Sequence, residues 1–436
     1  MQVPLLYGRD GLAVSIPDDA DVTVIRKPEM PTLTKPGDAV RDALISPISA
    51  TGQPTRTLKE LSADASSACI AICDITRPVP NQLFLRPMIE TLASAGIPMG
   101  KIVVLVATGL HRPNLGDELA ELIGDPWVLE HVDVVNHDAL ADRDHIDLGE
   151  TATRGTPVKI DRRFVEADLR IATGLVEPHF MAGYSGGRKV IAPGLAHADT
   201  IKTFHNHAFM SNPAASNCNL HLNPLHEEQL QIVKMIGGAL GLNTVIDEHR
   251  NLSMVNFGEI TASHDEAVSF VQQYCRVPVD RMYRTVITSA AGYPLDKTYY
   301  QTVKGMVGAV DILEPGGNLI VVSQCSEGLG SDEYAAAQVR LTQVGPQGFL
   351  KSIERKPLAD IDEWQTQMQT KAMTRGKIHL YSSLSSKHQA LTGVTIVKNL
   401  NEAIQRSIDA SDCKSVAVIP EGPYVVPYVQ ADSAVT

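Results

Sequence analysis

A regular alternation of short apolar runs with helix-like stretches constrains the fold of this chain more than any other feature. Segments 69–76 (CIAICDIT), 101–109 (KIVVLVATG), 132–136 and 169–175 have the length and branched character of buried strands. Between them, stretches 81–95 and 114–123 show helical periodicity. This order predicts a mostly parallel sheet, because parallel neighbours are joined through a crossover helix.

The same alternation returns from residue 285 onward, with strand-like runs at 285–292, 318–325, 377–384 and 415–422. A chain of 436 residues also exceeds a single typical core. We therefore expect an α/β protein of two Rossmann-like domains, 1–277 and 278–436, with the active-site cleft between them. The last residues could pack back on the first domain.

Composition excludes several kinds of partner. The net charge is -12 and no cluster of Lys and Arg is visible, which argues against nucleic acid. No apolar run is long enough to span a membrane, and the N-terminus lacks the pattern of a secretory signal, so we expect a cytoplasmic protein. The six cysteines lack CxxC spacing and are expected to be reduced: Cys69, Cys73, Cys218, Cys275, Cys325 and Cys413.

Polar residues follow directly on the strand-like runs. Asp74 and Arg77 come after the first run, His111 after the second and His179 after the run 169–175. Since the carboxyl ends of parallel strands meet at one edge of a sheet, these side chains should converge. Arg77, in the proline-stiffened loop 74–80, could present its guanidinium to a carboxylate or phosphate, or form a salt bridge within the loop.

Two histidines at adjacent strand ends suggest acid–base chemistry. His111 and His179 are placed as a reaction on both faces of one carbon would require, whereas a single histidine there would more often be a hydrogen-bonded structural residue. The sequence therefore predicts an enzyme that binds a small molecule.

The stretch Ser185-Gly-Gly-Arg-Lys189 offers backbone N–H groups where a helix could start, and such a turn can hold a phosphate. The spacing GxxxxGK[ST] is absent, which argues against a nucleoside triphosphatase. Lys189 could be a covalent anchor, a phosphate partner or a surface charge.

Further candidates lie downstream. Residues 206–227 read as a polar loop, followed by a helix over 228–241, and the histidine concentration invites a metal interpretation, although a zinc site made by protein alone is disfavoured: His205, His207, His221 and His226. Gln301 and Lys304 share one helix face and could hold a carboxylate, or simply face solvent.

Taken together, the motifs DxTRP, TGxHRP and EPHFxAGxSGGRK, in this order, resemble the nickel-pincer-nucleotide-dependent lactate racemase family. The resemblance implies an isomerase, a racemase or epimerase that inverts C2 of a 2-hydroxy acid. It implies that Lys189 covalently carries pyridinium-3-thioamide-5-thiocarboxylic acid mononucleotide with nickel. His205, sixteen residues after Lys189, would be the nickel ligand from the protein, with His207 as its rival.

The resemblance also implies roles for the remaining residues. His111 and His179 would exchange the hydroxyl proton while a hydride moves between C2 and the cofactor. The substrate carboxylate would be oriented by Arg77, Gln301 and Lys304, and Asp74, Thr76, Arg77 and Tyr300 would line the cofactor or substrate. The proteins that synthesise the cofactor would be transient partners.

The substrate stays open between lactate and a larger sugar acid such as gluconate, because the stretch 206–226 is more polar than a methyl group needs. Two alternatives remain. A Schiff-base enzyme would use Lys189 and need no nickel. A non-catalytic carrier of the nickel nucleotide would need neither His111 nor His179.

Overall fold

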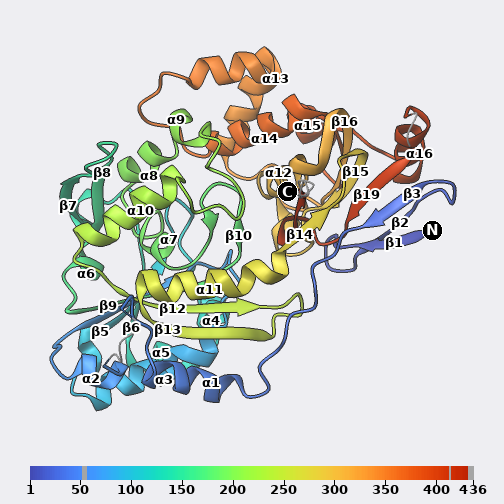
Figure 1. Ribbon diagram of the computed structural model, residues 1–436. Coiled ribbons are helices and arrows are strands. Elements are labelled where there is room, and N and C mark those ends of the chain that lie inside the picture. Colours follow the sequence, from blue (N-terminus) through green and yellow to red (C-terminus); the bar gives the residue numbers. More distant parts are fainter. Residues whose placement is uncertain (52–55, 412–413, 431–436) are drawn as a thin grey trace, which may run out of the picture. The chain divides into compact units, whose positions relative to one another are not determined.

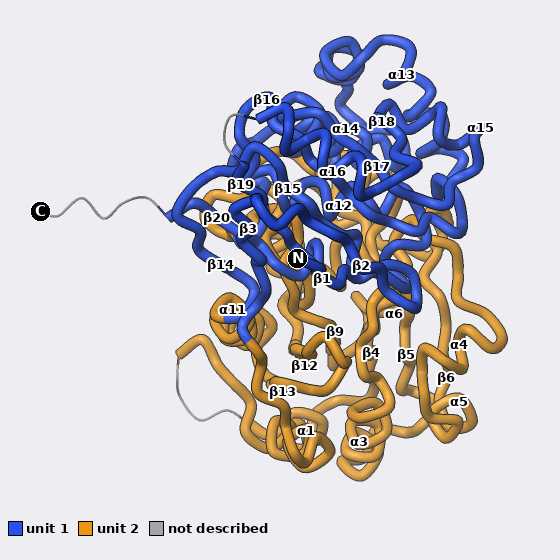
Figure 2. The backbone as a smooth tube through the Cα atoms, turned by 90° about the vertical axis from the view of Figure 1, so that its right-hand side faces the viewer, with its two compact units in different colours: residues 1–28, 205–218, 274–436 blue, residues 29–204, 219–273 orange. Residues whose placement is uncertain are grey.

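The computed structural model describes residues 1–51, 56–411 and 414–430. It divides into two compact units, which Figure 2 shows in different colours: unit 1 comprises 1–28, 205–218 and 274–436, and unit 2 comprises 29–204 and 219–273. The expected division into 1–277 and 278–436 differs from these units. Residues 1–28 belong with the C-terminal part because β3 (Asp21–Val24) pairs with β19 (Ser415–Ile419).

Unit 2 is built on a six-stranded sheet in the order β13-β12-β9-β4-β5-β6. Its pairs are parallel except β12–β13, which agrees with the predicted mostly parallel sheet. The strands are β4 (Ala68–Cys73), β5 (Ile102–Ala107), β6 (Asp133–Asn136), β9 (Leu169–Leu175), β12 (Leu240–Ile246) and β13 (Leu252–Glu259). Two small antiparallel pairs accompany it, β7 (His145–Glu150) with β8 (Pro157–Asp161) and β10 (Pro178–His179) with β11 (Gly183–Tyr184).

Helices cover both faces of this sheet. Figure 1 shows α1 and α3 on one side of β12 and β13 and α11 on the other. The helices are α1 (Pro36–Ile45), α2 (Leu58–Ser62), α3 (Asn81–Ser94), α4 (Gly116–Ile123), α5 (Pro126–His131), α6 (Arg162–Val165), α7 (Arg188–Ile191), α8 (Ala198–Phe204), α10 (Pro224–Met235) and α11 (Ile260–Cys275), with single turns η1 (Met99–Lys101) and η2 (Asp142–Asp144).

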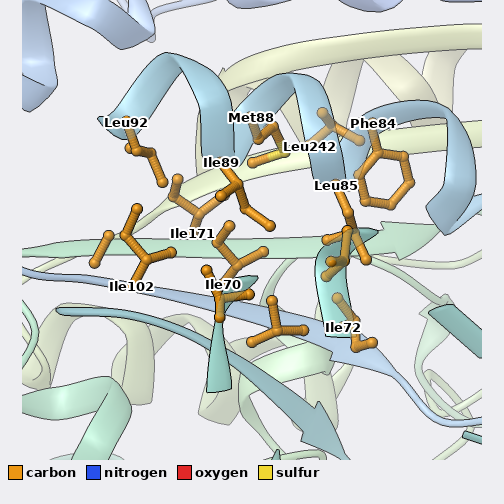
Figure 3. Packing of buried hydrophobic residues seen from close by; sticks show 14 of the residues in the cluster. Ile70, Ile72, Phe84, Leu85, Met88, Ile89, Leu92, Ile102, Ile171 and Leu242 are labelled. Carbon is orange, nitrogen blue, oxygen red and sulfur yellow. The ribbon is translucent and has the colours of Figure 1, made fainter. Parts of the chain in front are cut away.

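The packing of α3 explains how the sequence fixes this layer. Apolar residues recur along α3 at the spacing of one helix face, and Phe84, Met88 and Leu92 are completely buried. They lie against Ile70 of β4 and Ile171 of β9, as Figure 3 shows. Burial of this face aligns β4, whose carboxyl end carries the first site residues.

Unit 1 contains a parallel six-stranded sheet in the order β18-β17-β16-β15-β19-β3. The strands not yet named are β15 (Tyr283–Ser289), β16 (Leu313–Val322), β17 (Lys377–Tyr381) and β18 (Thr395–Ile396). β1 (Gln2–Leu5) and β2 (Leu12–Ser15) form a hairpin, and β14 (Arg276–Val279) pairs with β20 (Val426–Val429) of the same unit. This second Rossmann-like layer was predicted, whereas the contribution of residues 1–28 was not.

The helices of unit 1 surround that sheet. They are α9 (His207–Met210), α12 (Tyr299–Ala309), α13 (Asp332–Ile353), α14 (Glu363–Arg375), α15 (Ser386–Gln389) and α16 (Leu400–Asp409), with single turns η3 (Leu295–Lys297), η4 (Val310–Ile312) and η5 (Gly422–Tyr424). In the parts of the chain described above, no helix combines the length and the apolar character needed to cross a membrane.

Residues 206–241 differ from the sequence-based expectation. The helix expected over 228–241 begins at Pro224, ends at Met235 and gives way to β12 at Leu240. Two glycines, the poorest helix formers after proline, stand at 237–238. The expected loop 206–227 contains α9 and the start of α10, whose N-caps are the side chains of Asn206 and Asn223. Short polar helices capped by asparagine resemble loops in sequence.

Candidate active site

Three parallel strands of unit 2 end side by side. β4 lies between β5 and β9, with Cys73 opposite Ala107 and Ala71 opposite Ala172. The loops that follow these strands carry the residues predicted from the sequence, so the structure places the loops with Asp74, His111 and His179 at one edge of the sheet.

Asp74 and His111 form a direct pair. Oδ2 of Asp74 lies 2.6 Å from Nδ1 of His111, and Oδ1 accepts a 2.6 Å hydrogen bond from the Thr76 hydroxyl. Burial alone would raise the pKa of Asp74, but the neighbouring His111, Thr76 and Arg77 bring it below its ordinary value. The ionised carboxylate therefore holds the proton of His111 on Nδ1 and leaves Nε2 as the nitrogen that accepts a proton. The His111 side chain is half exposed.

Arg77 links two of the loops. Its Nε lies 3.4 Å from a carboxylate oxygen of Glu177, two residues before His179. Both sides of this ion pair are largely buried. The sequence placed Glu177 inside a motif but gave it no role, because a partner for Arg77 from the next strand end cannot be read from either loop alone. A guanidinium has five N–H donors, so Arg77 can hold Glu177 and still bind a second anion.

His179 is held differently from His111. It lies in the tight hairpin of β10 and β11 and is 9% exposed. Its Nδ1 accepts hydrogen bonds from the backbone N–H groups of Met181 (3.3 Å) and Ala182 (3.2 Å). The neutral ring therefore carries its proton on Nε2, the opposite tautomer to that of His111.

The glycine turn after His179 has a shape that only glycine permits. Gly186 and Gly187 have φ of 73° and 49°, and a Cβ at either would lie 2.8 Å from Val176 or from the ring of His264. Ser185 fastens the turn, since its hydroxyl donates to the Leu175 carbonyl at 2.7 Å and accepts from the Glu177 N–H at 3.1 Å.

Arg188 anchors this turn from inside unit 2. Its guanidinium, 2% exposed, donates to the Ala182 carbonyl (2.9 Å) and to Nε2 of His264 on α11 (2.8 Å). Burial lowers the pKa of Arg188 to about 9, and burial together with that neighbouring cation lowers the pKa of His264 to about 4. Arg188 is thus a structural cation rather than a residue that reaches a ligand in this conformation.

Lys189 follows on the single turn of α7 and is half-buried. Burial, and then the cation of Arg77, lower the pKa of its amine to about 7. A lysine so placed is substantially neutral near pH 7, which is the form that acts as a nucleophile.

In unit 1, His205 lies against a tryptophan. His205 is 8% exposed, and its ring centroid is 4.9 Å from that of Trp364 on α14. The indole Nε1 donates to the Tyr300 hydroxyl at 3.3 Å. Trp364 could not be predicted from the sequence, because α14 is polar in sequence although it is almost wholly buried.

The other predicted residues of unit 1 lie on α12 and α9. Gln301 and Lys304 are three positions apart on α12 and so share one face of the helix. Oε1 of Gln301 is buried without a hydrogen-bond partner. The carbonyl of His207 accepts from Gln367 at 3.4 Å, whereas its Nδ1 is buried and unpartnered. The choice between His205 and His207 therefore stays open.

No group of three or more His, Cys, Asp or Glu side chains within residues 1–51, 56–411 and 414–430 is arranged to hold a metal ion. A metal that receives most of its donors from a bound cofactor needs a single protein ligand. The assignment of His205 thus stays a prediction.

A two-part α/β architecture, with histidine loops on either side of β4 and a lysine of lowered pKa in the loop after β9, is typical of an enzyme. Residues 7–217 match the family described as the lactate racemase N-terminal domain, and residues 280–426 match the lactate racemase C-terminal domain. The lactate racemase of Thermoanaerobacterium thermosaccharolyticum is 30% identical over 434 residues, 97% of this chain and 98% of the relative. That of Lactiplantibacillus plantarum is 30% identical over 374 residues, 85% and 87% of the two chains. The chain belongs to the lactate racemase family and is an isomerase of the racemase type.

Solved structures agree with this assignment. The lactate racemase apoprotein from T. thermosaccharolyticum superposes with a TM-score of 0.88 at 28% identity, covering 98% of this chain and all of the other. A protein from Thermotoga maritima has a TM-score of 0.66 at 17% identity, over 86% and 96% of the chains, and shares the fold.

Proposed function

We propose that this enzyme inverts C2 of a 2-hydroxy acid, with lactate as the first candidate substrate and a sugar acid such as gluconate as the second. The observation that carries the proposal is the pair of histidine loops that follow β5 and β9, on either side of β4, in which Nδ1 of each ring is held by a different kind of partner. The two curated relatives are both named lactate racemase, which favours lactate.

The proposed cofactor is the nickel-pincer nucleotide, attached to Lys189 and ligated at nickel by His205. Several features of the chain fit such a group. The pKa of the Lys189 amine, about 7, leaves enough of the neutral form to be acylated near pH 7. The turn before it has no room for a Cβ at Gly186 or Gly187, and His205 is a buried imidazole. Asp74, Thr76, Arg77 and Tyr300 would line it. When bound, the cofactor would supply a site that takes up and returns the hydride of C2.

The residues of the chain would manage the proton and the carboxylate. His111 would take the hydroxyl proton of one enantiomer at Nε2. His179, whose Nε2 carries a proton in the tautomer described above, would present that N–H to the substrate oxygen as a hydrogen-bond donor, and would act as base for the opposite enantiomer only in its other tautomer. His111 would take up that proton readily, because the Asp74 carboxylate 2.6 Å away stabilises the imidazolium.

The substrate carboxylate would be oriented by Arg77, Gln301 and Lys304. Arg77 can contribute while it remains paired with Glu177, and Gln301 has a buried, unpartnered oxygen beside its amide group. This requires that the two units present these side chains to one substrate, in the cleft predicted from the sequence.

The decisive experiment is intact mass and nickel content of the chain produced together with the proteins that synthesise the cofactor. We expect a mass increase and about one nickel per chain, both lost in Lys189→Ala. The loaded protein should then interconvert D- and L-lactate, or invert C2 of gluconate.

Other outcomes would redirect the assignment. No adduct and no nickel, with loading verified on a known lactate racemase, would favour a Lys189 Schiff-base enzyme, which borohydride would trap on a carbonyl substrate. A loaded chain that inverts no 2-hydroxy acid would point to a carrier of the nucleotide.

A further inference from the structure

Two cysteine thiols are in contact within unit 1. Sγ of Cys218 lies 3.9 Å from Sγ of Cys275, the distance of a weak S–H···S hydrogen bond, although 57 positions separate them in the sequence. Both are free thiols in the structure. A disulfide bond is about 2.05 Å long, so the two sulfurs need to approach by about 2 Å.

Both cysteines stand where the chain passes between the two units. The chain leaves unit 1 directly after Cys218 and returns to it after residue 273, two positions before Cys275. A bond between the two sulfurs would therefore join the two connections that bracket residues 219–273.

The backbone is anchored on each side of this pair. Before Cys218, Lys371 of α14 donates to the Ala215 carbonyl at 3.4 Å. After it, the Asn219 carbonyl accepts from the Asn223 amide at 2.9 Å and packs directly on Gly183, in the hairpin that holds His179. After Cys275 the chain enters β14, which is paired with β20. Because both backbones are already ordered, bringing the sulfurs together costs little additional chain entropy.

The two thiols differ in accessibility. Cys218 is partly exposed, and Cys275 is 1% exposed. The hydrogen bond between the two thiols, together with burial, raises the pKa of the Cys275 thiol. An oxidant from solution would thus meet Cys218 first, and Cys275 would react as the second, resolving thiol.

We propose that Cys218 and Cys275 form a reversible disulfide, which fastens the end of segment 205–218 under oxidising conditions. The oxidant is a low-molecular-weight disulfide of the oxidised glutathione type. The Cys218 thiolate attacks one sulfur of that disulfide and releases the first small thiolate. The Cys275 thiolate then attacks the Cys218 sulfur and releases the second. The two protein thiols lose two electrons, and the two released thiolates gain them and take up the two protons.

The bond would act on a segment that matters to the site. Segment 205–218 begins at His205, and Asn219 packs on the His179 hairpin. The oxidation state of the Cys218–Cys275 pair would therefore set how freely segment 205–218 moves, from the His205 end to the end beside the His179 hairpin. The inference concerns the thiols themselves and does not depend on the proposed function.

The test is disulfide mapping on the whole chain. The reduced protein is incubated with graded ratios of oxidised to reduced glutathione, the remaining thiols are alkylated, and the digest is searched for a peptide joining Cys218 to Cys275. We expect this cross-linked peptide to be the dominant one, to be lost on reduction, and to be absent in Cys218→Ser and Cys275→Ser. The peptides of Cys69, Cys73 and Cys325 serve as internal controls and should be alkylated.

Amide hydrogen exchange gives the second readout and needs no variant. Oxidation should slow exchange in peptides covering 205–223 by several fold and leave α3 unchanged. The proposal is overturned if the native chain forms no such cross-link at any glutathione ratio, if it forms one only after denaturation, or if the cross-link leaves exchange in 205–223 unaltered.

Discussion

The loops after β5 and β9 hold their histidines in different ways. The first holds His111 through a carboxylate, Asp74, and leaves the ring half exposed. The second holds His179 through two backbone N–H groups in a buried hairpin. A carboxylate stabilises the protonated ring, whereas N–H donors aimed at Nδ1 favour the neutral one. The two histidines proposed to serve mirror-image substrates therefore need not be electrostatic equivalents.

The largest effect should come from removing either histidine. We expect His111→Ala and His179→Ala each to lower the rate of racemisation by about 10³-fold in both directions, since inversion uses both proton-transfer groups. Polarimetry or chiral chromatography of the loaded enzymes measures this. Full activity in either variant would remove that residue from the acid–base pair.

Replacing the Asp74 carboxylate should affect His111 and leave His179 unchanged. Asp74→Asn keeps the shape but deprives the His111 imidazolium of its charged partner, and we expect kcat to fall by roughly 10²-fold. The limb of the pH–rate profile that reports His111 should move to lower pH. Thr76→Val, which removes a neutral donor to the same carboxylate, is the matched control. An unshifted profile in Asp74→Asn would show that the carboxylate serves the structure alone.

Loss of the Ser185 hydroxyl should destabilise the loop after β9. Ser185→Ala removes the hydrogen bonds to Leu175 and Glu177. We expect a loss of about 1–2 kcal/mol in unfolding free energy and about tenfold in kcat. The pH limb assigned to His111 should stay in place. Movement of that limb would mean that the two loops are not independent.

Acid should loosen the loop after β9 before the loop after β5. Burial first, and then the charge of Arg188, lower the pKa of His264 to about 4 and that of His226 to about 3, below the ordinary value of 6.5. The folded state binds fewer protons, so the stability these groups contribute is present above pH 6.5 and is lost as pH falls toward 4. We expect a decline on the order of 1–2 kcal/mol for each group by pH 5.

Peptide-resolved hydrogen exchange between pH 7 and pH 5, corrected for the intrinsic rate, follows this change. Exchange should increase in 177–191 relative to 108–115, because His264 contacts the Ser185–Arg188 turn. His226→Gln should reduce the acid sensitivity. Equal protection of both loops at pH 5 would contradict the difference in their support.

That the loops after β4, β5 and β9 meet at one edge of the sheet could be predicted from the sequence, whereas the partners that hold each histidine could not. The ends of strands can be predicted because an apolar run stops at a polar residue, as the run that ends at Cys73 stops at Asp74. Contacts between loops cannot be predicted in this way. The Arg77–Glu177 and Asp74–His111 pairs depend on the strand order β9-β4-β5, and no local sequence pattern specifies that order.

Helix-borne residues were harder to predict. Trp364 lies in a helix of glutamines and threonines that is buried through side-chain hydrogen bonds, such as Gln338 to Gln369, rather than through an apolar stripe. Hydrophobic periodicity does not predict which face of such a helix is buried. Residues 206–227 were expected to form a loop for another reason: the stretch holds the four-residue α9 and only the start of α10, each capped by an asparagine.

The pairing of β3 with β19 has a consequence for how the chain is made. Residues 21–24 are synthesised long before their partner at 415–419. The edge strand of the unit 1 sheet must therefore wait, while the intervening unit 2 residues can already assemble. A fragment limited to 280–426 would lack β3 and expose the edge of β19 as an unpaired template. A growing chain in which residues 415–419 have not yet emerged likewise carries β3 without its partner strand.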